Sequence, residues 1–252
     1  FAGTIDVLGN AHATLTHLGN TTTGNPLGMK TNLSFVGNGE LDGGQKVNVT
    51  IAHTDQNAWS SAGIKLDTNS LGSWKISSAE GSGGLGGYDD NMPRAFEEVW
   101  DSGVGTNINL AKGVGSSMNL QYTTPAVLGA KLIVAWAPNN DGAQVNDKAT
   151  SGGSDAFGTG FDVVLDVSPS FGQLFLGYSQ TEIPQTQNDG AATKEARNED
   201  QHREVTAGLQ AFIGPIKLGG QASVEHNPES QPGKVEYYGT TSWGVSFNVN
   251  DD

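Results

Sequence analysis

Apolar and polar side chains alternate with a period of two along most of the chain. In residues 46–51, 118–123 and 161–168, every second side chain is apolar and most of those between are polar. Successive side chains of a strand point to opposite faces of its sheet, so this period is typical of strands with one apolar and one polar face. The pattern predicts an all-β chain of about twelve strands. They lie near residues 4–18, 29–42, 45–55, 60–69, 73–80, 117–125, 130–137, 160–168, 173–182, 203–213, 216–226 and 236–249.

The connections between these segments alternate between long and short. The long or polar connections include residues 20–28, 81–116, 138–159 and 183–202. The short ones have two to four residues and are centred on Gly43-Gly44, Leu71-Gly72, Leu128-Gly129, Phe171-Gly172 and Ile213-Gly214. Glycine supplies the positive φ that tight hairpins need. The alternation predicts antiparallel strands that run up and down, whereas a Greek-key sandwich would not sort its loops in this way.

Charged residues within the predicted strands gather on the polar face. They are Lys30, Lys46, Lys65, Lys75, Lys131, Lys217, Asp6, Glu40, Asp67, Asp162, Asp166, Glu204 and Glu225. Asp55 and Arg203 are the exceptions: they have the parity of the apolar residues, and both lie at strand ends on the long-loop side. Burying so many charges in a dry core would cost several kcal/mol each, so we expect the whole polar face to be wet. An apolar exterior around a polar lumen predicts a transmembrane β-barrel that forms a single domain over residues 1–252.

Composition narrows the choice of function. The net charge of −14 disfavours nucleic acid as a partner, and the absence of cysteine excludes disulfides and thiolate metal sites. No apolar run is long enough for a transmembrane helix. A soluble or surface-attached adhesive β protein would share the acidic, cysteine-free composition and stays an alternative. Such a protein has no reason to keep its strand charges on one face.

Aromatic residues on the apolar face are expected to mark the two membrane interfaces. Their positions in the predicted strands place them near the two ends of the sheet. We expect Trp74, Tyr122, Phe161 and Phe247 near the short-turn end, and Trp136 and Tyr178 towards the long-loop end.

The longest connection, residues 81–116, contains the segment NMPRAFEEVWDSG from Asn91 to Gly103. Pro93 suits a first helical position and Gly103 a helix stop, so the segment predicts a helix of two to three turns. The glycine-rich sequences on either side would let the loop fold back on the barrel.

Three segments resemble the trimeric general porins of Gram-negative outer membranes, the alphaproteobacterial (Pelagibacter-like) type in particular. They are NPLGMKTNLSFVGNGELDGGQKV (25–47), YDDNMPRAFEEVWDSG (88–103) and YYGTTSWGVSFNVND (237–251). The resemblance implies an outer-membrane homotrimer, in contact with lipopolysaccharide, whose pores pass small hydrophilic solutes and ions by passive diffusion. It also implies that the third long loop, residues 81–116, folds into the barrel and narrows the pore.

In such a pore, acidic loop residues face basic residues on the opposite wall. The loop candidates are Asp89, Asp90, Arg94, Glu97, Glu98 and Asp101, and the wall candidates are Lys30, Lys46, Lys65, Lys75 and Lys131. The wall carries lysine where the family usually has arginine, which leaves the strength of the field open. Five loop acids and the net charge of −14 predict a mild cation preference.

Other chemistry finds weaker support. The stretch GGLGGYDDN resembles one imperfect calcium-binding repeat, so Asp89 and Asp90 are candidate calcium ligands. The acidic residues of the loop could equally form a solvated surface or bind divalent cations together with lipopolysaccharide. An outer-membrane hydrolase needs a serine, a histidine and an orienting group held together. The chain has no G-x-S-x-G elbow and no histidine pair at the i, i+4 spacing of helical zinc sites. The sequence therefore predicts that the protein is not an enzyme.

The resemblance also implies a sixteen-stranded barrel. The 252 residues give 21 per strand for twelve strands with their connections, so four more strands require about 84 residues. The chain ends in FNVNDD, without the terminal aromatic residue of the family. We therefore expect that this chain lacks the last strands of such a barrel, although twelve strands can also close by themselves.

Overall fold

The computed structural model describes residues 3–15, 27–54, 59–78, 83–94, 110–115, 117, 119–138, 140, 158–182, 201–226 and 235–247. Twelve antiparallel strands form one sheet in chain order, which confirms the predicted up-and-down topology. The strands are β1 (Gly3–Leu15), β2 (Leu27–Glu40), β3 (Lys46–Thr54), β4 (Trp59–Asp67), β5 (Ser73–Ser78), β6 (Asn119–Thr123), β7 (Ala130–Ala137), β8 (Gly160–Val167), β9 (Gly172–Glu182), β10 (Gln201–Ile213), β11 (Ile216–His226) and β12 (Tyr237–Phe247).

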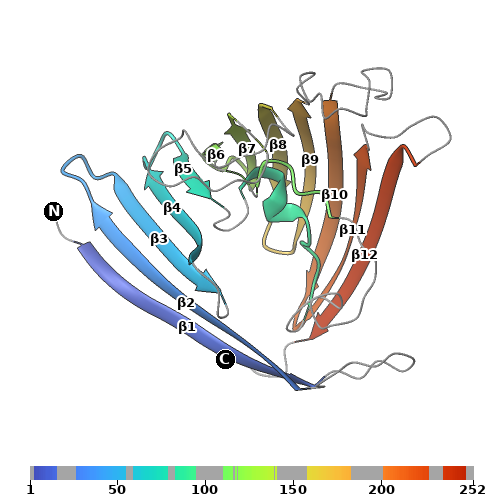
Figure 1. The fold of residues 1–252 in the computed structure, drawn as a ribbon, viewed down its shortest axis with the longest axis horizontal. Coiled ribbons are helices and arrows are strands. Elements are labelled where there is room, and N and C mark those ends of the chain that lie inside the picture. The colour runs from blue at the N-terminus through green and yellow to red at the C-terminus, as the bar shows by residue number, and fades with distance from the viewer. Residues whose placement is uncertain are drawn as a thin grey trace, which may run out of the picture.

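The sheet curves strongly, and the connection between β5 and β6 enters its concave side (Figure 1). The described part of this connection contains the 3-10 helix η1 (Gly84–Tyr88). Strands β1 and β12 are the two edges of the sheet, and within the described residues they do not pair with each other. The sheet is therefore an open, barrel-like trough with a segment of chain inside it.

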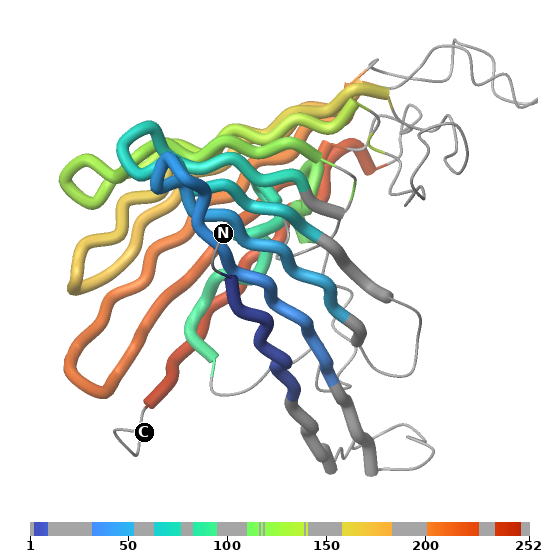
Figure 2. The backbone as a smooth tube through the Cα atoms, turned by 90° about the vertical axis from the view of Figure 1, so that its left-hand side faces the viewer, coloured from blue at the N-terminus to red at the C-terminus, as the bar shows by residue number. Residues whose placement is uncertain are grey.

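The short hairpins gather at one end of the strands, on the left-hand side of Figure 2. In the β4–β5 hairpin, the backbone N–H of Thr68 donates to the carbonyl oxygen of Gly72 over 3.0 Å. Gly72 has φ of 86°, and a Cβ there would collide with the carbonyl oxygen of Thr123 on β6. Only glycine meets both conditions, so the sequence L-G fixes this hairpin.

Side chains on the convex face are exposed and mainly apolar, as the parity predicts. Ile5 and Trp243, on the two edge strands, are 78% and 80% exposed. Strand β8 alternates Phe161, Val163 and Leu165 on this face with inward-facing Asp162 and Asp166. Glu182 also lies on the convex face of β9, although the sequence pattern predicts only Asp55 and Arg203 as charges with this parity. Like Arg203, it lies at a strand end on the long-loop side.

One expectation about the aromatic residues is wrong. Trp74 and Tyr122 do lie together near the short hairpins, with ring centroids 4.7 Å apart. Phe161, however, lies opposite Trp136 in the β7–β8 register and 6.2 Å from the ring of Tyr178. The reason is topological, because Phe161 follows a long connection and therefore starts its strand at the long-loop end.

The prediction of a wholly wet inner face is also wrong for half of the sheet. Asp162 and Thr206 are fully inaccessible, and Asp166, Ser179 and Glu204 are at most 5% exposed. The β5–β6 connection lies over them, and it donates hydrogen bonds to the carboxylates of Asp162, Asp166 and Glu204. Along β1–β5, in contrast, inward side chains such as Lys65 and Asp67 keep nearly half of their surface. The inner face therefore has a covered half and an open half.

Among the described residues, no helix combines the length and the hydropathy needed to cross a bilayer.

Candidate functional site

The β5–β6 connection packs against the inner face of β7–β9 through a small apolar cluster. Leu85 and Tyr88 of η1 are buried there with Ala111, and the wall contributes Ile133, Val164 and Phe175. Leu85 lies over Gly177 of β9, where any Cβ would collide with its side chain. A side chain at position 177 would therefore lift η1 from the wall.

The carboxylate of Asp162, on β8, accepts hydrogen bonds from two distant parts of the loop. The backbone N–H of Leu85 donates to Oδ2 over 2.7 Å. The backbone N–H of Val114 donates to the same oxygen over 3.1 Å and to Oδ1 over 3.2 Å. A fully buried charge is expensive unless it is hydrogen-bonded, and these amides supply that compensation. Asp162 thereby joins the two ends of the described loop to one strand.

Glu204, on β10, does the same for the adjacent loop residues. The backbone N–H of Lys112 donates to Oε1 over 2.9 Å, and that of Gly113 donates to Oε2 over 2.7 Å. Both carboxylates therefore bind main-chain donors of the segment 112–114. We call Asp162 and Glu204 the anchor carboxylates.

Two glycines allow the loop to approach Asp162 this closely. Gly84 and Gly113 have φ of 57° and 55°, in the left-handed region. A Cβ on either would also collide with the carboxylate of Asp162. Backbone conformation and space both require glycine at these positions.

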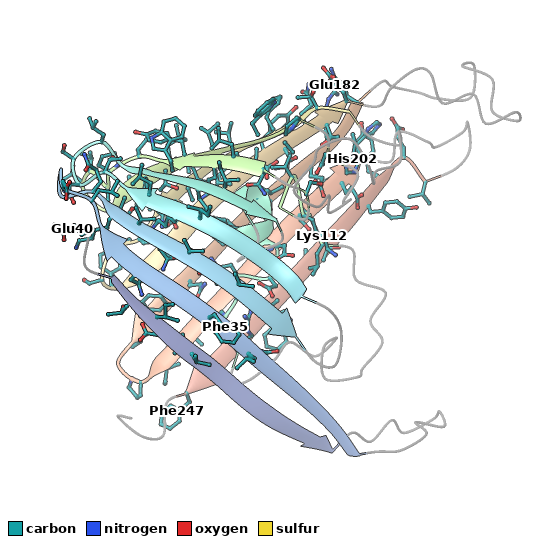
Figure 3. All side chains as sticks on the ribbon, turned by 60° about the vertical axis from the view of Figure 1, so that its left-hand side comes forward. Phe35, Glu40, Lys112, Glu182, His202 and Phe247 are labelled. Carbon is teal, nitrogen blue, oxygen red and sulfur yellow. The ribbon has the colours of Figure 1, made fainter. Side chains whose placement is uncertain are left out.

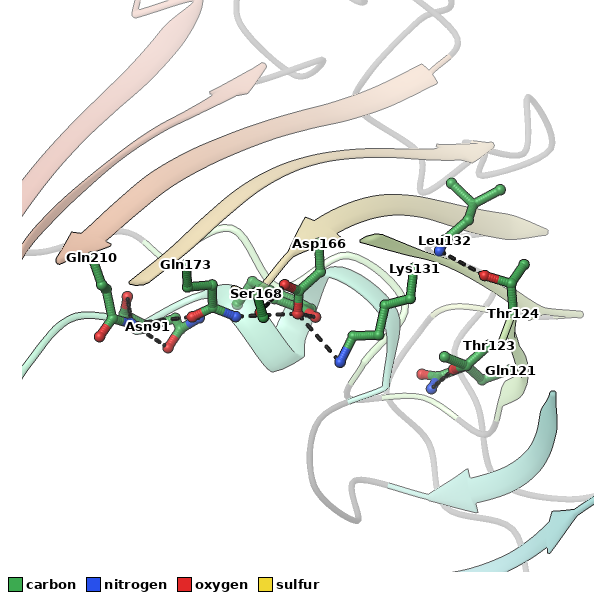
Figure 4. A network of polar contacts seen from close by, with 11 residues as sticks. Asn91, Gln121, Thr123, Thr124, Lys131, Leu132, Asp166, Ser168, Gln173 and Gln210 are labelled. Atoms are coloured by element: carbon green, nitrogen blue, oxygen red, sulfur yellow. Dashed lines mark hydrogen bonds and ion pairs between the residues drawn. The ribbon is translucent and has the colours of Figure 1, made fainter. Parts of the chain in front are cut away.

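A third inward carboxylate, Asp166 of β8, organises a polar network (Figure 4). The Tyr88 hydroxyl donates to its Oδ2 over 2.5 Å, the Gln173 amide donates to the same oxygen over 3.1 Å, and Ser168 donates to Oδ1. Lys131 of β7 forms an ion pair with it at 3.3 Å. Burial, followed by the hydrogen bond to Asp166, raises the pKa of Tyr88 above its usual value. The phenol therefore stays protonated as a donor.

The network continues along the loop towards β10. The side-chain amide of Asn91 donates to Gln173 over 2.8 Å, and the Gln210 amide donates to the carbonyl and side-chain oxygens of Asn91 over 3.0 and 2.9 Å. On β11, the Gln221 amide donates to the carbonyl oxygens of Tyr88 and Asp89 over 2.8 and 2.5 Å. These residues bind the loop through its backbone carbonyl oxygens and through the side chain of Asn91.

Beyond η1, the loop crosses β11 and β12 at Pro93. Gly219 and Gly244 are register partners on these strands, and a Cβ on either would collide with Pro93. The loop therefore spans the inner face from β7 to β12 and narrows the trough over that width. The open half, β1–β5, lies across from it (Figure 1).

The loop candidates occupy different settings. Asp90 forms an ion pair with Arg94 at 3.4 Å, and both side chains are more than one third exposed. Burial is the main cause, and the negative charge of Asp90 the second, that raises the pKa of Asp89 to about 7. Glu97, Glu98 and Asp101 lie outside the described residues. Asn91–Arg94 are not helical, and the rest of the predicted helix 91–103 also lies outside the described part.

Three of the wall candidates lie together on the open half. Lys46, Lys65 and Lys75 point inward from β3, β4 and β5, and Lys65 and Lys75 are direct register partners. Lys65 forms an ion pair with Asp67 at 3.3 Å. A hollow on this half has Glu40, Lys46, Lys65 and Asp67 among its lining residues. Lys131 lies on the other half, beside Asp166, and the side chain of Lys30 falls outside the described part.

Parity predicts that the anchor carboxylates face the lumen, but no motif in the sequence indicates what they bind. The signal available for Asp162 is the set of glycines that face it. Gly84 and Gly113 lie in the glycine-rich flanks of the loop, and Gly177 has inward parity on β9. A wall position without a side chain marks a place where another segment approaches closely.

Comparison with known proteins gives structural matches. No known family profile and no curated protein matches the chain. Salmonella typhi OmpF, solved in complex with daunomycin, superposes with a TM-score of 0.58 at 15% identity, over 88% of this chain. This chain spans 66% of that OmpF chain. A mutant of Rh. blastica porin matches with a TM-score of 0.47 at 12% identity, over 97% of this chain and 99% of its own.

The OmpF match and the strand order together show a porin-like fold. The identity is too low for the likeness to carry function by itself.

Proposed function

We propose that this protein is an outer-membrane porin, a water-filled pore for passive diffusion of small hydrophilic solutes and ions. The observation that carries the proposal is the position of the β5–β6 loop. It is anchored inside a sheet that is apolar outside and polar inside, and there it narrows the lumen. We call it the constriction loop.

Selection in such a pore comes from size and charge. The constriction loop forms one side of the passage, and the polar side chains of β1–β5 form the other. No catalytic step is involved, because solutes cross down their own gradient.

The acidic composition supports a mild cation preference. Acidic residues outnumber basic ones by 27 to 13. Asp89 and Asp90 lie on the constriction loop, and Lys46, Lys65 and Lys75 lie on the polar face of β3, β4 and β5. Opposite charges on the two sides would produce a field across the passage, and the acid excess would favour cations over anions.

The exposed apolar outer face supports insertion in an outer membrane, with lipopolysaccharide as the outer-leaflet partner and a homotrimer as the assembly. A sheet in lipid must close, since unpaired edge groups cannot be satisfied there. Closure can come from pairing of β1 with β12 or from further strands. The number of strands in the closed pore and the calcium role of Asp89 and Asp90 stay predictions.

Planar-bilayer recordings of the refolded protein test the proposal. We expect discrete, voltage-insensitive openings with a mild cation preference. Replacing Lys65 and Lys75 together by glutamate should raise the cation-to-anion permeability ratio about two-fold or more. Two positive charges of the wall become negative, so the net charge at the passage falls by about four units. The measurement is the reversal potential in a salt gradient.

The matched control exchanges Lys217 for glutamate, since this lysine lies at the short hairpin between β10 and β11. A ratio that changes equally in both proteins would contradict the assigned wall. A wild-type protein that inserts without opening any channel would overturn the pore proposal and favour the adhesive alternative.

Cation preference should also depend on pH through Asp89. Because its pKa is raised to about 7, the carboxyl is largely neutral at pH 5 and ionised at pH 9. The permeability ratio for cations should therefore rise across this interval. Asp89→Asn should remove part of the rise, and Asp67→Asn on the open wall serves as control. Identical pH profiles for wild type and Asp89→Asn would contradict this assignment.

A further inference from the structure

Three side chains with metal-binding groups converge at the long-loop end of the inner face. His202 and Glu204 lie on β10, and Glu225 lies on β11. Figure 3 places His202 at the same end as Lys112 of the constriction loop, away from Glu40 at the opposite end. None of the three belongs to the charges proposed to line the passage.

Their ligand atoms are close enough to share one ion. Nε2 of His202 is 2.9 Å from Oε1 of Glu225, and one ligand atom from each of the three residues lies within 4.8 Å of the others. Two ligands about 2.1 Å from a tetrahedral zinc ion lie roughly 3.4 Å apart. The observed spacing brackets this value, so small side-chain rotations suffice to bring all three into coordination.

The two glutamates give this cluster a reason to hold a cation. Glu204 and Glu225 are direct register partners on neighbouring strands, where like charges destabilise a sheet. Glu204 is only 5% exposed, so water screens its charge poorly. The hydrogen-bonded imidazole of His202 supplies at most one positive charge against two negative ones.

We propose that His202, Glu204 and Glu225 bind a divalent transition-metal ion, with Zn²⁺ as the preferred ion. An imidazole nitrogen suits Zn²⁺, whereas Ca²⁺ and Mg²⁺ select all-oxygen sites. Three protein ligands leave a fourth position for water.

The site would also reach the constriction loop. A carboxylate has about four lone-pair positions, so Glu204 can coordinate the ion while it still accepts the backbone N–H groups of Lys112 and Gly113. Those amides would then hold and orient a metal ligand. The ion would tie the loop anchor to β11 as well as to β10.

Titration calorimetry of the refolded full chain in detergent with ZnCl₂ tests the proposal, independently of any pore activity. We expect one Zn²⁺ per chain, and at least ten-fold weaker binding for His202→Gln and for Glu225→Gln. Zn²⁺ should raise the melting temperature of the wild type more than that of either variant. Ca²⁺ and Mg²⁺ at the same concentrations should bind more weakly than Zn²⁺.

Glu182→Gln is the matched control, because Glu182 lies at the same end of the neighbouring strand β9 but outside the cluster. Circular dichroism must show the wild-type strand content in each variant that is compared. The proposal is overturned if the wild type binds no stoichiometric Zn²⁺, if the His202 and Glu225 variants bind as tightly as it does, or if Ca²⁺ binds more tightly than Zn²⁺.

Discussion

Replacing Asp162 and Glu204 together by alanine is expected to raise the single-channel conductance about two-fold and to make the open current noisy. The two anchor carboxylates accept hydrogen bonds from the backbone N–H groups of Leu85, Val114, Lys112 and Gly113. A hydrogen bond to a charged group is worth about 1.5–3 kcal/mol, and the alanines would also leave four amide donors without these acceptors. The loop should therefore leave the wall while the strands stay paired.

Recordings in EDTA-containing buffer separate this effect from any bound metal. The control is Asp67→Ala, which removes a carboxylate from the open wall without touching a loop amide. Circular dichroism should show unchanged strand content in both proteins. If the double variant folds and conducts like the wild type, the anchor carboxylates do not hold the constriction.

The second large effect concerns the outer face. Ile51 and Thr50 are neighbours in the middle of β3, with Ile51 on the convex face and Thr50 on the inner face. Ile51→Arg should destabilise the folded protein in lipid vesicles by about 2–4 kcal/mol, because arginine would face hydrocarbon near the bilayer midplane. Thr50→Arg places the same side chain in the aqueous lumen and should cost much less.

Urea titrations of the two variants in the same vesicles measure the difference, with folded protein followed by its electrophoretic mobility without heating. Equal stabilities for the two variants would mean that the convex face does not contact lipid. That result would favour the alternative of an adhesive β protein.

The strands and hairpins could be predicted because their signals are local. Strands predicted at residues 203–213 and 216–226 correspond to Gln201–Ile213 and Ile216–His226. The period of two fixes which side chain faces inward, and the hairpin glycine fixes the turn. Even the misplaced Phe161 follows from topology, since a residue just after a long connection starts at the long-loop end.

The covered half of the inner face could not be predicted from the same signals. Parity shows that Asp162 points inward, but it does not show what lies above it. Its partners are the amides of Leu85 and Val114, which are 77 and 48 residues away in the chain. Main-chain donors leave no mark in the side-chain pattern, and η1 lies in a glycine-rich stretch that carries no helical signal.

The way in which the constriction loop is held has a consequence for how such a chain can change over generations. The anchor carboxylates of Asp162 and Glu204 accept hydrogen bonds from backbone N–H groups, which every non-proline residue possesses. The exposed side chains of Lys112 and Arg94 are not bound by these anchors, so their exchange is expected to leave the attachment in place. If the proposed pore function holds, its permeability can diversify by substitution at these positions while Gly84, Gly113 and the two carboxylates stay constant.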